Sequence, residues 1–372
     1  MTDRLQELSD LGVSIWLDDL DRTRLTTGGL RTLTQQDHVV GVTTNPSIFS
    51  KAISAGADAY ATQVASLASG QADADFAVRE MTTQDVRDAC DVMAEIAGRT
   101  DGVDGRVSIE VDPRLARDTE ATIAQARELW QQVDRPNLLI KIPGTREGLP
   151  AITAAISEGI SVNVTLIFSV DRYREVIDAW ARGLENRIAA GQDVADIHSV
   201  ASFFVSRVDT AIDAELEKVG SDEALAMRGK AGIANARLAW AAYQQFRATD
   251  RWNALHAAGV HPQRPLWAST SVKDPAFPDD MYVVELAGPG CVNTMPEPTL
   301  RAVADHGALR GNTLDGQQDA SQQVFDRLEE LGVDLDAVFV QLETEGVDKF
   351  EQAWAELLGT VTEALAQDRS TT

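Results

Sequence analysis

The sequence is poor in cysteine and has no long apolar run. Its 372 residues contain two cysteines, Cys90 and Cys291, without CxxC or Cys/His ligand spacing, so no disulfide framework is indicated. No apolar run approaches the length that spans a membrane, and residues 1–12 lack the basic and apolar segments of a secretory leader. We therefore expect a soluble, cytoplasmic protein that does not enter a membrane.

Basic residues are also few, with 33 Lys and Arg against 58 Asp and Glu and a formal net charge of -25. Such a surface repels phosphate backbones and anionic lipid, which argues against a nucleic-acid partner and against membrane-surface binding. An anionic small molecule would need a local basic pocket. With 44% hydrophobic residues, the chain can bury a core large enough for one α/β barrel or two ordinary domains.

What the chain does have is an alternation of short apolar runs with amphipathic stretches. The runs of β type lie at 14–19, 39–45, 107–112, 137–143, 160–168, 199–207, 265–270 and 281–286. Helical periodicity fills most of the intervals, at 75–99, 116–133, 148–159, 169–188 and in a long pair over 207–257. Repeated strand–helix units indicate a parallel sheet, and eight of them favour a closed (β/α)8 TIM barrel of the α/β class over an open doubly wound sheet.

The chain is longer than the ~250 residues that a bare barrel needs. We assign the excess to helical insertions near 46–105 and 207–257 and to extra C-terminal helices from about residue 298. No Pro/Ser-rich linker or repeat divides the sequence. We therefore predict a single (β/α)8 barrel domain over residues 1–372 with additional helices.

One lysine lies where a charge is unfavourable. Lys141 interrupts the apolar run 138–142, and it is one of six lysines in the chain. Burial disfavours the ammonium form, and a neutral amine can attack a carbonyl to form a Schiff base. The same side chain could instead end a strand and extend its ammonium into water. The run alone leaves both interpretations open.

Polar side chains alternate with apolar ones along the strands around this lysine. In a barrel wrapped by helices the outward face must be apolar, so the polar set points inward. The polar set on the third, fourth and fifth predicted strands consists of Ser108, Glu110, Asp112, Lys141, Ser161, Asn163 and Thr165. Buried polar groups are unfavourable unless each is paired, so this convergence predicts a catalytic site near the carboxyl ends of the strands.

The first two predicted strands add Asp18, Thr43 and Asn45 to the same end of the barrel. A carboxylate near a lysine amine can act as a general acid and base. Asp18 and its acidic neighbours Asp19 and Asp21 could instead hold Mg²⁺, but no ligating histidine or matching carboxylate set lies on adjacent predicted strand ends. We predict no metal site. The five histidines show no HxxxH or HExxH spacing, and we expect each to be structural or exposed.

Schiff-base chemistry on a sugar needs an amine, proton-transfer groups and hydroxyl binders. Lys141 would be the amine, and Asp18 could be the base for C–C bond cleavage. Glu110 and Thr165 could position a water for proton transfer. The remaining inward polar residues, as hydroxyl binders, are Asn45, Asn163 and Ser202.

A basic group follows the sixth and seventh predicted strands, where barrel enzymes often hold a substrate phosphate. Ser206 and Arg207 close the sixth strand, and the segment 268–273 closes the seventh and ends in Lys273. Arginine offers a bidentate fork and lysine a point charge for phosphate. Arg207 could equally pair with Asp209 as a surface ion pair.

Five motifs together resemble the transaldolase family, in the family's order. They are GVTTNPSIF (41–49), VSIEVDPRLA (107–116), NLLIKIPGTREGLPAI (137–152), SVNVTLIFS (161–169) and SFFVSR (202–207). The resemblance covers about residues 12–300. The SIWLDDLDR opening and the segment 265–300 look like the larger bacterial subgroup of the family.

The resemblance implies a cofactor-free barrel enzyme of the pentose phosphate pathway, in carbohydrate metabolism. It would transfer a dihydroxyacetone unit from a ketose phosphate (sedoheptulose 7-phosphate or fructose 6-phosphate) to an aldose phosphate (glyceraldehyde 3-phosphate or erythrose 4-phosphate). It assigns the Schiff base to Lys141, acid–base roles to Asp18 and Glu110, and water positioning to Thr165. We expect a monomer or homodimer.

The resemblance also matches binding positions. The substrate positions are Asn45, Asn163, Ser202 and Phe204, and the phosphate positions are Arg207 and Ser269. Many members carry an arginine two residues after this serine, whereas this chain has Ser271 there and a lysine only at 273. Lys273 is the candidate to complete the phosphate site.

Three alternatives stay open. A related aldolase would cleave fructose 6-phosphate without transferring the fragment, but members limited to cleavage tend to carry glutamine and tyrosine where this chain has Glu110 and Phe204. A metal-dependent sugar-phosphate isomerase on the same fold would lose its activity to chelators. A barrel that only binds a sugar phosphate would not need a buried amine beside carboxylates.

Overall fold

Eight parallel strands close into a barrel in the computed structural model, which describes residues 3–371. Each strand pairs with the next one along the chain, and the last pairs with the first, which confirms the predicted (β/α)8 fold. The strands are β1 Ser14–Leu17, β2 Val39–Val42, β3 Arg106–Glu110, β4 Leu138–Pro143, β5 Val162–Ile167, β6 Ser199–Phe204, β7 Arg264–Ala268 and β8 Val292–Met295.

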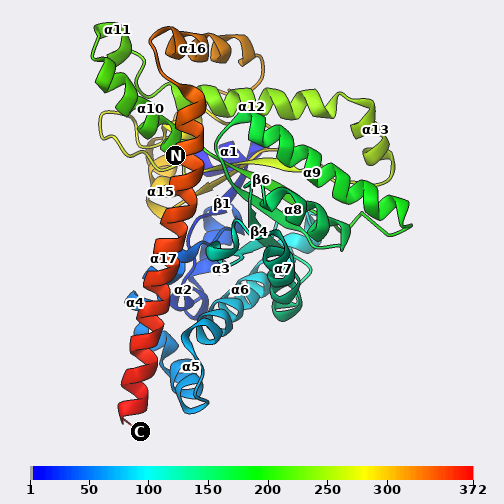
Figure 1. The fold of residues 1–372 in the computed structure, drawn as a ribbon, viewed down its shortest axis with the longest axis vertical. Helices are drawn as coiled ribbons and strands as arrows, with labels where there is room; N and C mark the ends of the chain where they lie inside the picture. The colour runs from blue at the N-terminus through cyan, green and yellow to red at the C-terminus, as the bar shows by residue number, and fades with distance from the viewer. Residues whose placement is uncertain (1–2, 372) are drawn as a thin grey trace.

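Helices surround the barrel (Figure 1). Those before β4 are α1 Arg4–Asp10, α2 Arg22–Thr26, α3 Gly29–Gln36, α4 Pro46–Ala55, α5 Ala57–Ser69, α6 Ala74–Arg99, the 3-10 turn η1 Pro113–Leu115 and α7 Thr119–Val133. Those between β4 and β7 are α8 Gly148–Ser157, α9 Val170–Ala189, α10 Ser206–Val219, α11 Asp222–Leu225, α12 Ala231–Arg247 and α13 Asp250–Ala257. The later ones are α14 Met281–Val284, α15 Glu297–His306, α16 Gln318–Glu330 and α17 Leu335–Thr371.

The predicted position of the eighth strand is wrong. The apolar run at 281–286 begins with the helix α14, and the strand is β8, eight residues after α14 ends. Only four residues long and half polar, with Asn293 and Thr294 at its centre, β8 has too little apolar pattern to be detected locally. Its place is set by pairing on both sides, with β1 and with β7.

Several other predicted strands extend too far at their C-terminal ends. Strands β1, β2 and β6 end two or three residues earlier than predicted. The residues beyond β2 and β6 include the N-caps of α4 and α10, Asn45 and Val205, and the first residues of α10. The predicted long pair at 207–257 is a series of helices, α10 to α13. The predicted insertion at 46–105 consists of α4, α5 and α6.

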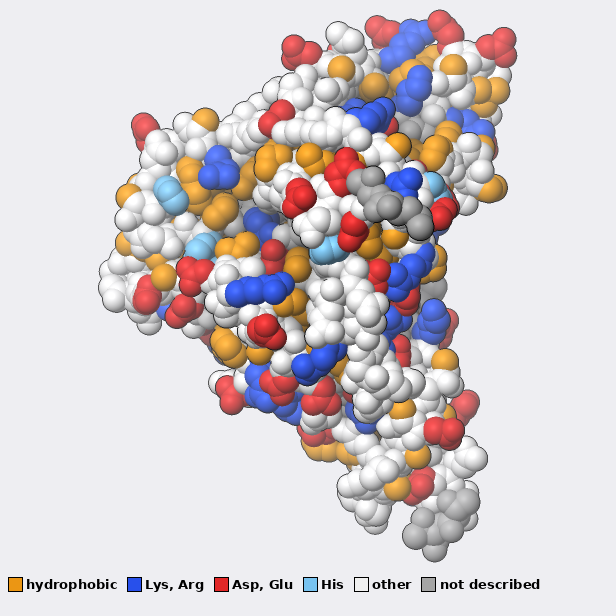
Figure 2. Space-filling model, turned by 180° about the vertical axis from the view of Figure 1, so that it is seen from behind, with side chains coloured by type: hydrophobic (Ala, Val, Ile, Leu, Met, Phe, Trp, Pro, Cys, Tyr) orange, Lys and Arg blue, Asp and Glu red, His pale blue; other side chains and the backbone are white. Residues whose placement is uncertain are grey.

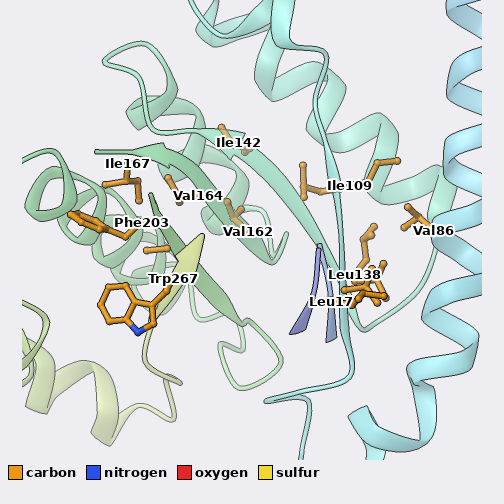
Figure 3. Close-up of a cluster of buried hydrophobic side chains, with 14 of the residues drawn as sticks. Leu17, Val86, Ile109, Leu138, Ile142, Val162, Val164, Ile167, Phe203 and Trp267 are labelled. Carbon is orange, nitrogen blue, oxygen red and sulfur yellow. The ribbon is translucent and has the colours of Figure 1, made fainter. Parts of the chain in front are cut away.

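The main core lies between the barrel and its helices. Outward-facing side chains of the strands fill it, and the helices close it from outside, as the labelled side chains in Figure 3 illustrate. The labelled members on the strands and on α6 include Leu17, Val86, Ile109, Leu138, Ile142, Val162, Val164, Phe203 and Trp267. The period-two alternation of the strands therefore separates this apolar layer from the polar inward face.

A second apolar cluster fills the inside of the barrel. Trp16, Leu139, Val200, Leu266 and Val292 belong to it, and all are buried. The Trp16 indole occupies the space beside β2, where a Cβ on the glycine at 41 would lie 2.5 Å from the ring. The cluster continues beyond the strand ends to side chains of α10 and α17, so these helices cover the mouth of the barrel.

Helix α17 runs along much of the molecule, from beside α10 to α5 (Figure 1). It packs on α4, α5, α6, α10, η1 and β5. On the face seen in Figure 2, acidic and basic side chains are interspersed with small apolar areas. Within residues 3–371, no helix combines the length and the hydropathy needed to cross a membrane.

Candidate active site

Strand register places three predicted site residues in one row. Glu110 on β3 lies opposite Lys141 on β4, which lies opposite Asn163 on β5. The Lys141 side chain is buried, with the residue 4% exposed, and its Nζ is 3.4 Å from Glu110 Oε2. The amine therefore sits inside the barrel against a carboxyl group and does not reach bulk water.

The segment that follows β2 supports the site in three ways. Lys141 Nζ donates a hydrogen bond of 3.0 Å to the carbonyl oxygen of Thr44. The Thr43 hydroxyl donates to Asp18 Oδ1 at 2.7 Å, and Asn45 caps the N-terminus of α4 by accepting from the backbone N–H of Ile48. In chain order, Thr43 therefore contacts the Asp18 carboxylate, Thr44 contacts the Lys141 amine, and Asn45 caps α4.

Glu110 is poised to exchange a proton near neutral pH. Burial raises its pKa to about 7, against the opposing attraction of the Lys141 ammonium. Apart from that ion pair, neither carboxyl oxygen has a hydrogen-bond partner among the described residues. Glu110 also lines a cavity of about 220 Å³, which leaves room for water beside it.

Asp18 is the second carboxylate of the site. Burial raises its pKa, while Lys141 and the hydrogen bond from Thr43 act in the opposite direction. The Thr43 hydroxyl lies 2.6 Å from the Thr294 hydroxyl on β8, which fixes the donor to Asp18. Two carboxyl groups thus flank one amine, each in an environment that favours the protonated form.

Below the lysine, a buried hydrogen-bond chain crosses three strands. The Ser202 hydroxyl donates to Asn163 Oδ1 at 2.7 Å, and Asn163 Nδ2 donates to Ser108 Oγ at 3.0 Å. Thr165, further along β5, is buried and its hydroxyl has no partner among the described residues. These two hydrogen bonds fix the orientation of the Asn163 amide, whereas within residues 3–371 the Thr165 hydroxyl is left without a partner.

A cavity of about 270 Å³ opens above this row. The predicted site residues that line it are Asp18, Asn45, Lys141, Ser202, Phe204, Arg207, Ser269 and Lys273. Asn163 and Glu110 lie behind this lining: Asn163 accepts the hydrogen bond from Ser202, and Glu110 contacts Lys141. Thr165, like Glu110 and Asn163, does not itself line this cavity.

The basic end of the cavity is formed by Arg207 and Lys273. Arg207 lies in the first turn of α10, and its buried Nη1 has no hydrogen-bond partner among the described residues. Lys273 is exposed, and its Nζ donates to Ser271 Oγ at 2.5 Å. Burial lowers the pKa of Arg207, and partial desolvation where Lys273 lines the cavity lowers the pKa of that lysine, which the nearby Arg207 guanidinium lowers further.

The alternative pairing of Arg207 with Asp209 is wrong. Asp209 is buried and accepts hydrogen bonds of 2.7 Å from the Gly232 backbone and from the Tyr282 hydroxyl. The arginine therefore keeps its donors for a ligand in the cavity. Next to it, the Ser206 and Ser269 hydroxyls lie 2.8 Å apart, and Ser269 has the left-handed φ of 55°.

The magnesium alternative at the first strand is not supported by the arrangement of its carboxylates. Asp19 and Asp21 both form ion pairs with Arg24, and Asp21 also caps α2. Among residues 3–371, the acidic and histidine side chains close enough to share a cation are Asp279, Asp280 and His306, a group without Asp18.

Sequence reasoning missed the contribution of the C-terminal helix. Phe350 on α17 lines the cavity, 4% exposed, with its ring centroid 5.7 Å from Lys141 Nζ. Its apolar spacing along α17 is that of any core-facing helix position, so no local signal distinguishes it. Thr294 was missed for a related reason, because the eighth strand was predicted elsewhere.

The closed barrel and the polar cavity at the carboxyl ends of its strands define an enzyme of the (β/α)8 class. A comparison with protein families gives a match to transaldolase/fructose-6-phosphate aldolase over residues 15–361. The chain belongs to this transaldolase/fructose-6-phosphate aldolase family.

Curated relatives match almost the whole chain. It is 63% identical over 354 residues to a transaldolase of Mycolicibacterium smegmatis, covering 95% of each protein. It is 59% identical over 362 residues to a transaldolase of Thermobifida fusca, covering 97% of this chain and 98% of the relative. A protein of Streptomyces avermitilis named transaldolase 2 is 59% identical over 358 residues, covering 96% of each.

Proposed function

We propose that this protein is a transaldolase, a transferase that moves a dihydroxyacetone unit between sugar phosphates through a Schiff base on Lys141. The observation that carries the proposal is the buried Lys141 amine, which faces the cavity and lies beside Glu110. The names of the relatives with 59% to 63% identity support the same reaction.

The reaction begins with attack of the Lys141 amine on the ketose carbonyl. The resulting carbinolamine loses water, and Glu110 supplies the proton for the departing hydroxyl, directly or through a water near Thr165. Asp18 then accepts the proton of the hydroxyl next to the breaking C–C bond, and an aldose phosphate leaves. The enamine that remains on Lys141 attacks an acceptor aldose phosphate, and the same steps run in reverse.

The other residues of the cavity bind substrate in this proposal. Asn45, Asn163 and Ser202 bind hydroxyl groups and Phe204 forms an apolar wall. Arg207, Ser269 and Lys273 hold the phosphate, which is supported by the free donors of Arg207 and by the lysine lying beside it. No metal or other cofactor enters this reaction.

The finer assignments are proposals as well. We place the enzyme in the pentose phosphate pathway, with sedoheptulose 7-phosphate or fructose 6-phosphate as donor and glyceraldehyde 3-phosphate or erythrose 4-phosphate as acceptor. We also propose a cytoplasmic location, in line with two free, buried cysteines, and a monomer or homodimer.

Borohydride reduction in the presence of fructose 6-phosphate, followed by peptide mass mapping, tests the Schiff base. We expect a three-carbon ketose adduct on Lys141 in the parent protein and none in Lys141→Ala. Lys273→Ala is the matched control, since it removes the other lysine of the cavity and should still be trapped at Lys141. No adduct on any lysine of the parent would overturn the proposal.

Transfer is separated from simple cleavage by adding an acceptor. With fructose 6-phosphate and erythrose 4-phosphate we expect sedoheptulose 7-phosphate as the main product. Free dihydroxyacetone as the main product would show an aldolase limited to cleavage, against the expectation from Glu110 and Phe204.

A further inference from the structure

Helix α17 places an aromatic ring beside two of the three basic side chains of the cavity, Lys141 and Arg207. The Phe350 ring centroid lies 5.7 Å from Lys141 Nζ and 5.9 Å from Arg207 Cζ. Phe350 comes from the C-terminal helix, more than 140 residues beyond Arg207 in the chain. The ring therefore connects the amine end of the cavity with its phosphate end.

Arg207 is held by aromatic rings instead of carboxylates. Its guanidinium lies 5.2 Å from the Phe204 ring centroid and 5.9 Å from that of Phe350. Ring faces attract a cation without accepting its N–H hydrogen bonds, so they position the guanidinium and leave its donors free. A carboxylate in the same place would occupy those donors and repel a phosphate.

Glu345, the acidic residue of α17 whose charge acts on Arg207, does not take that role. Glu345 is engaged at the helix surface, where it accepts hydrogen bonds from Gln341 and from Lys349. The charges of Asp18, Glu110 and Glu345 all act on Arg207, but within residues 3–371 none of these carboxylates forms an ion pair with it. The positive charge at this end of the cavity thus remains available.

Gly346, one turn before Phe350 on α17, lets the helix pack closely against the end of β5. A Cβ on Gly346 would lie 3.1 Å from Leu166 Cδ2 and 3.2 Å from the Phe168 ring, so this glycine lets α17 approach β5 closely. The Phe168 ring in turn packs on Phe204 with centroids 5.1 Å apart. The approach of α17 that carries Phe350 is thus set against Leu166 and Phe168, and Phe168 packs on Phe204, which lines the cavity.

We propose that Phe350 is a positioning residue for the phosphate group of the substrate. Together with Phe204 it clamps the Arg207 guanidinium so that its free donors face the cavity, and it covers Lys141 from above. The proposal rests on the proposed function for the identity of the phosphorylated ligand, a sugar phosphate.

Substitution of the ring by an aliphatic side chain of similar size tests the clamp. Phe350→Leu should weaken binding of inorganic phosphate by about three- to tenfold, because one of two cation–ring contacts is lost. Calorimetric titration with inorganic phosphate measures this without any turnover. Phe350→Tyr keeps the ring and should bind phosphate within about twofold of the parent.

Substrate preference gives a second readout that a merely structural role would not move. In Phe350→Leu, kcat/KM for glyceraldehyde 3-phosphate as acceptor should fall by about three- to tenfold more than kcat/KM for unphosphorylated glyceraldehyde. Phe339→Leu on the same helix is the matched control, because Phe339 stacks on Phe325 and does not line the cavity. It should leave this ratio unchanged.

Equal losses for both acceptors, or unchanged phosphate binding in folded Phe350→Leu, would overturn the proposal. Phe350→Met, which also lacks a ring, takes its place if the leucine variant does not fold. Failure of the proposed function is seen separately, as the absence of borohydride trapping in the parent, whereas the phosphate titration still reports on the clamp.

Discussion

Glu110 is the residue whose protonation should govern the first half of the reaction. A carboxyl group with a pKa of about 7 carries its proton below that pH and is charged above it. Loss of water from the carbinolamine needs a proton donor, so the rate of borohydride trapping in single turnover should fall as the pH rises through about 7.

The variant Glu110→Gln should lack this pH dependence and react about 10²- to 10⁴-fold more slowly. Glu147→Gln, an exposed carboxylate just after β4, is the control and should retain the parent profile. A parent-like pH profile in Glu110→Gln would assign the titration to another group, with Asp18 the next to test.

Two glycines on different elements should respond in opposite ways to the same added methyl group. Gly41→Ala on β2 would press a Cβ against the Trp16 ring at 2.5 Å and should destabilise the protein by about 1–3 kcal/mol. Gly98 is exposed on α6, and a Cβ added there would meet no heavy atom within 4 Å. Gly98→Ala should therefore stabilise the protein by about 0.5–1 kcal/mol, because alanine favours the helix. Chemical denaturation of both variants measures the difference.

A stabilising effect of Gly41→Ala would show that the Trp16 ring can move away from β2, and that the inner layer of the barrel is less tightly packed than the structure indicates. The comparison needs no activity, so it also tests the barrel independently of the site.

Long periodic helices were predicted nearly to the residue, and of the short strands β1 and β2 were located but β8 was not. The stretch predicted at 75–99 corresponds to α6 at 74–99, and that at 169–188 corresponds to α9 at 170–189. By contrast, β8 has four residues and was placed on the run that forms α14. A period of 3.6 is clear over 20 residues, whereas four residues carry almost no periodic signal.

The whole chain should unfold as one unit. We propose that residues 1–372 form a single domain, because α17 packs on helices from the first third of the chain and on β5. Its far end is also tied down, since Arg369 Nη2 donates to the Ala72 carbonyl oxygen at 2.7 Å. Scanning calorimetry should give one transition whose van't Hoff and calorimetric enthalpies agree.

Two resolved transitions, with the earlier one abolishing phosphate binding, would instead show that α17 and its neighbours unfold on their own. Arg369→Ala helps to identify such a unit, because it would lower only the transition to which the end of α17 belongs.

The sequence by itself determined the barrel and the row of groups inside it. Alternation along β3, β4 and β5 turns Glu110, Lys141 and Asn163 to one side, and parallel pairing of consecutive strands brings them together. Only the tertiary structure decided what surrounds that row. It brings the Phe350 ring to the site, and it gives Arg207 aromatic rings as neighbours while Asp209 pairs elsewhere. Local periodicity specifies which face of an element is apolar, but the docking of a helix from the far end of the chain depends on packing that no short window contains.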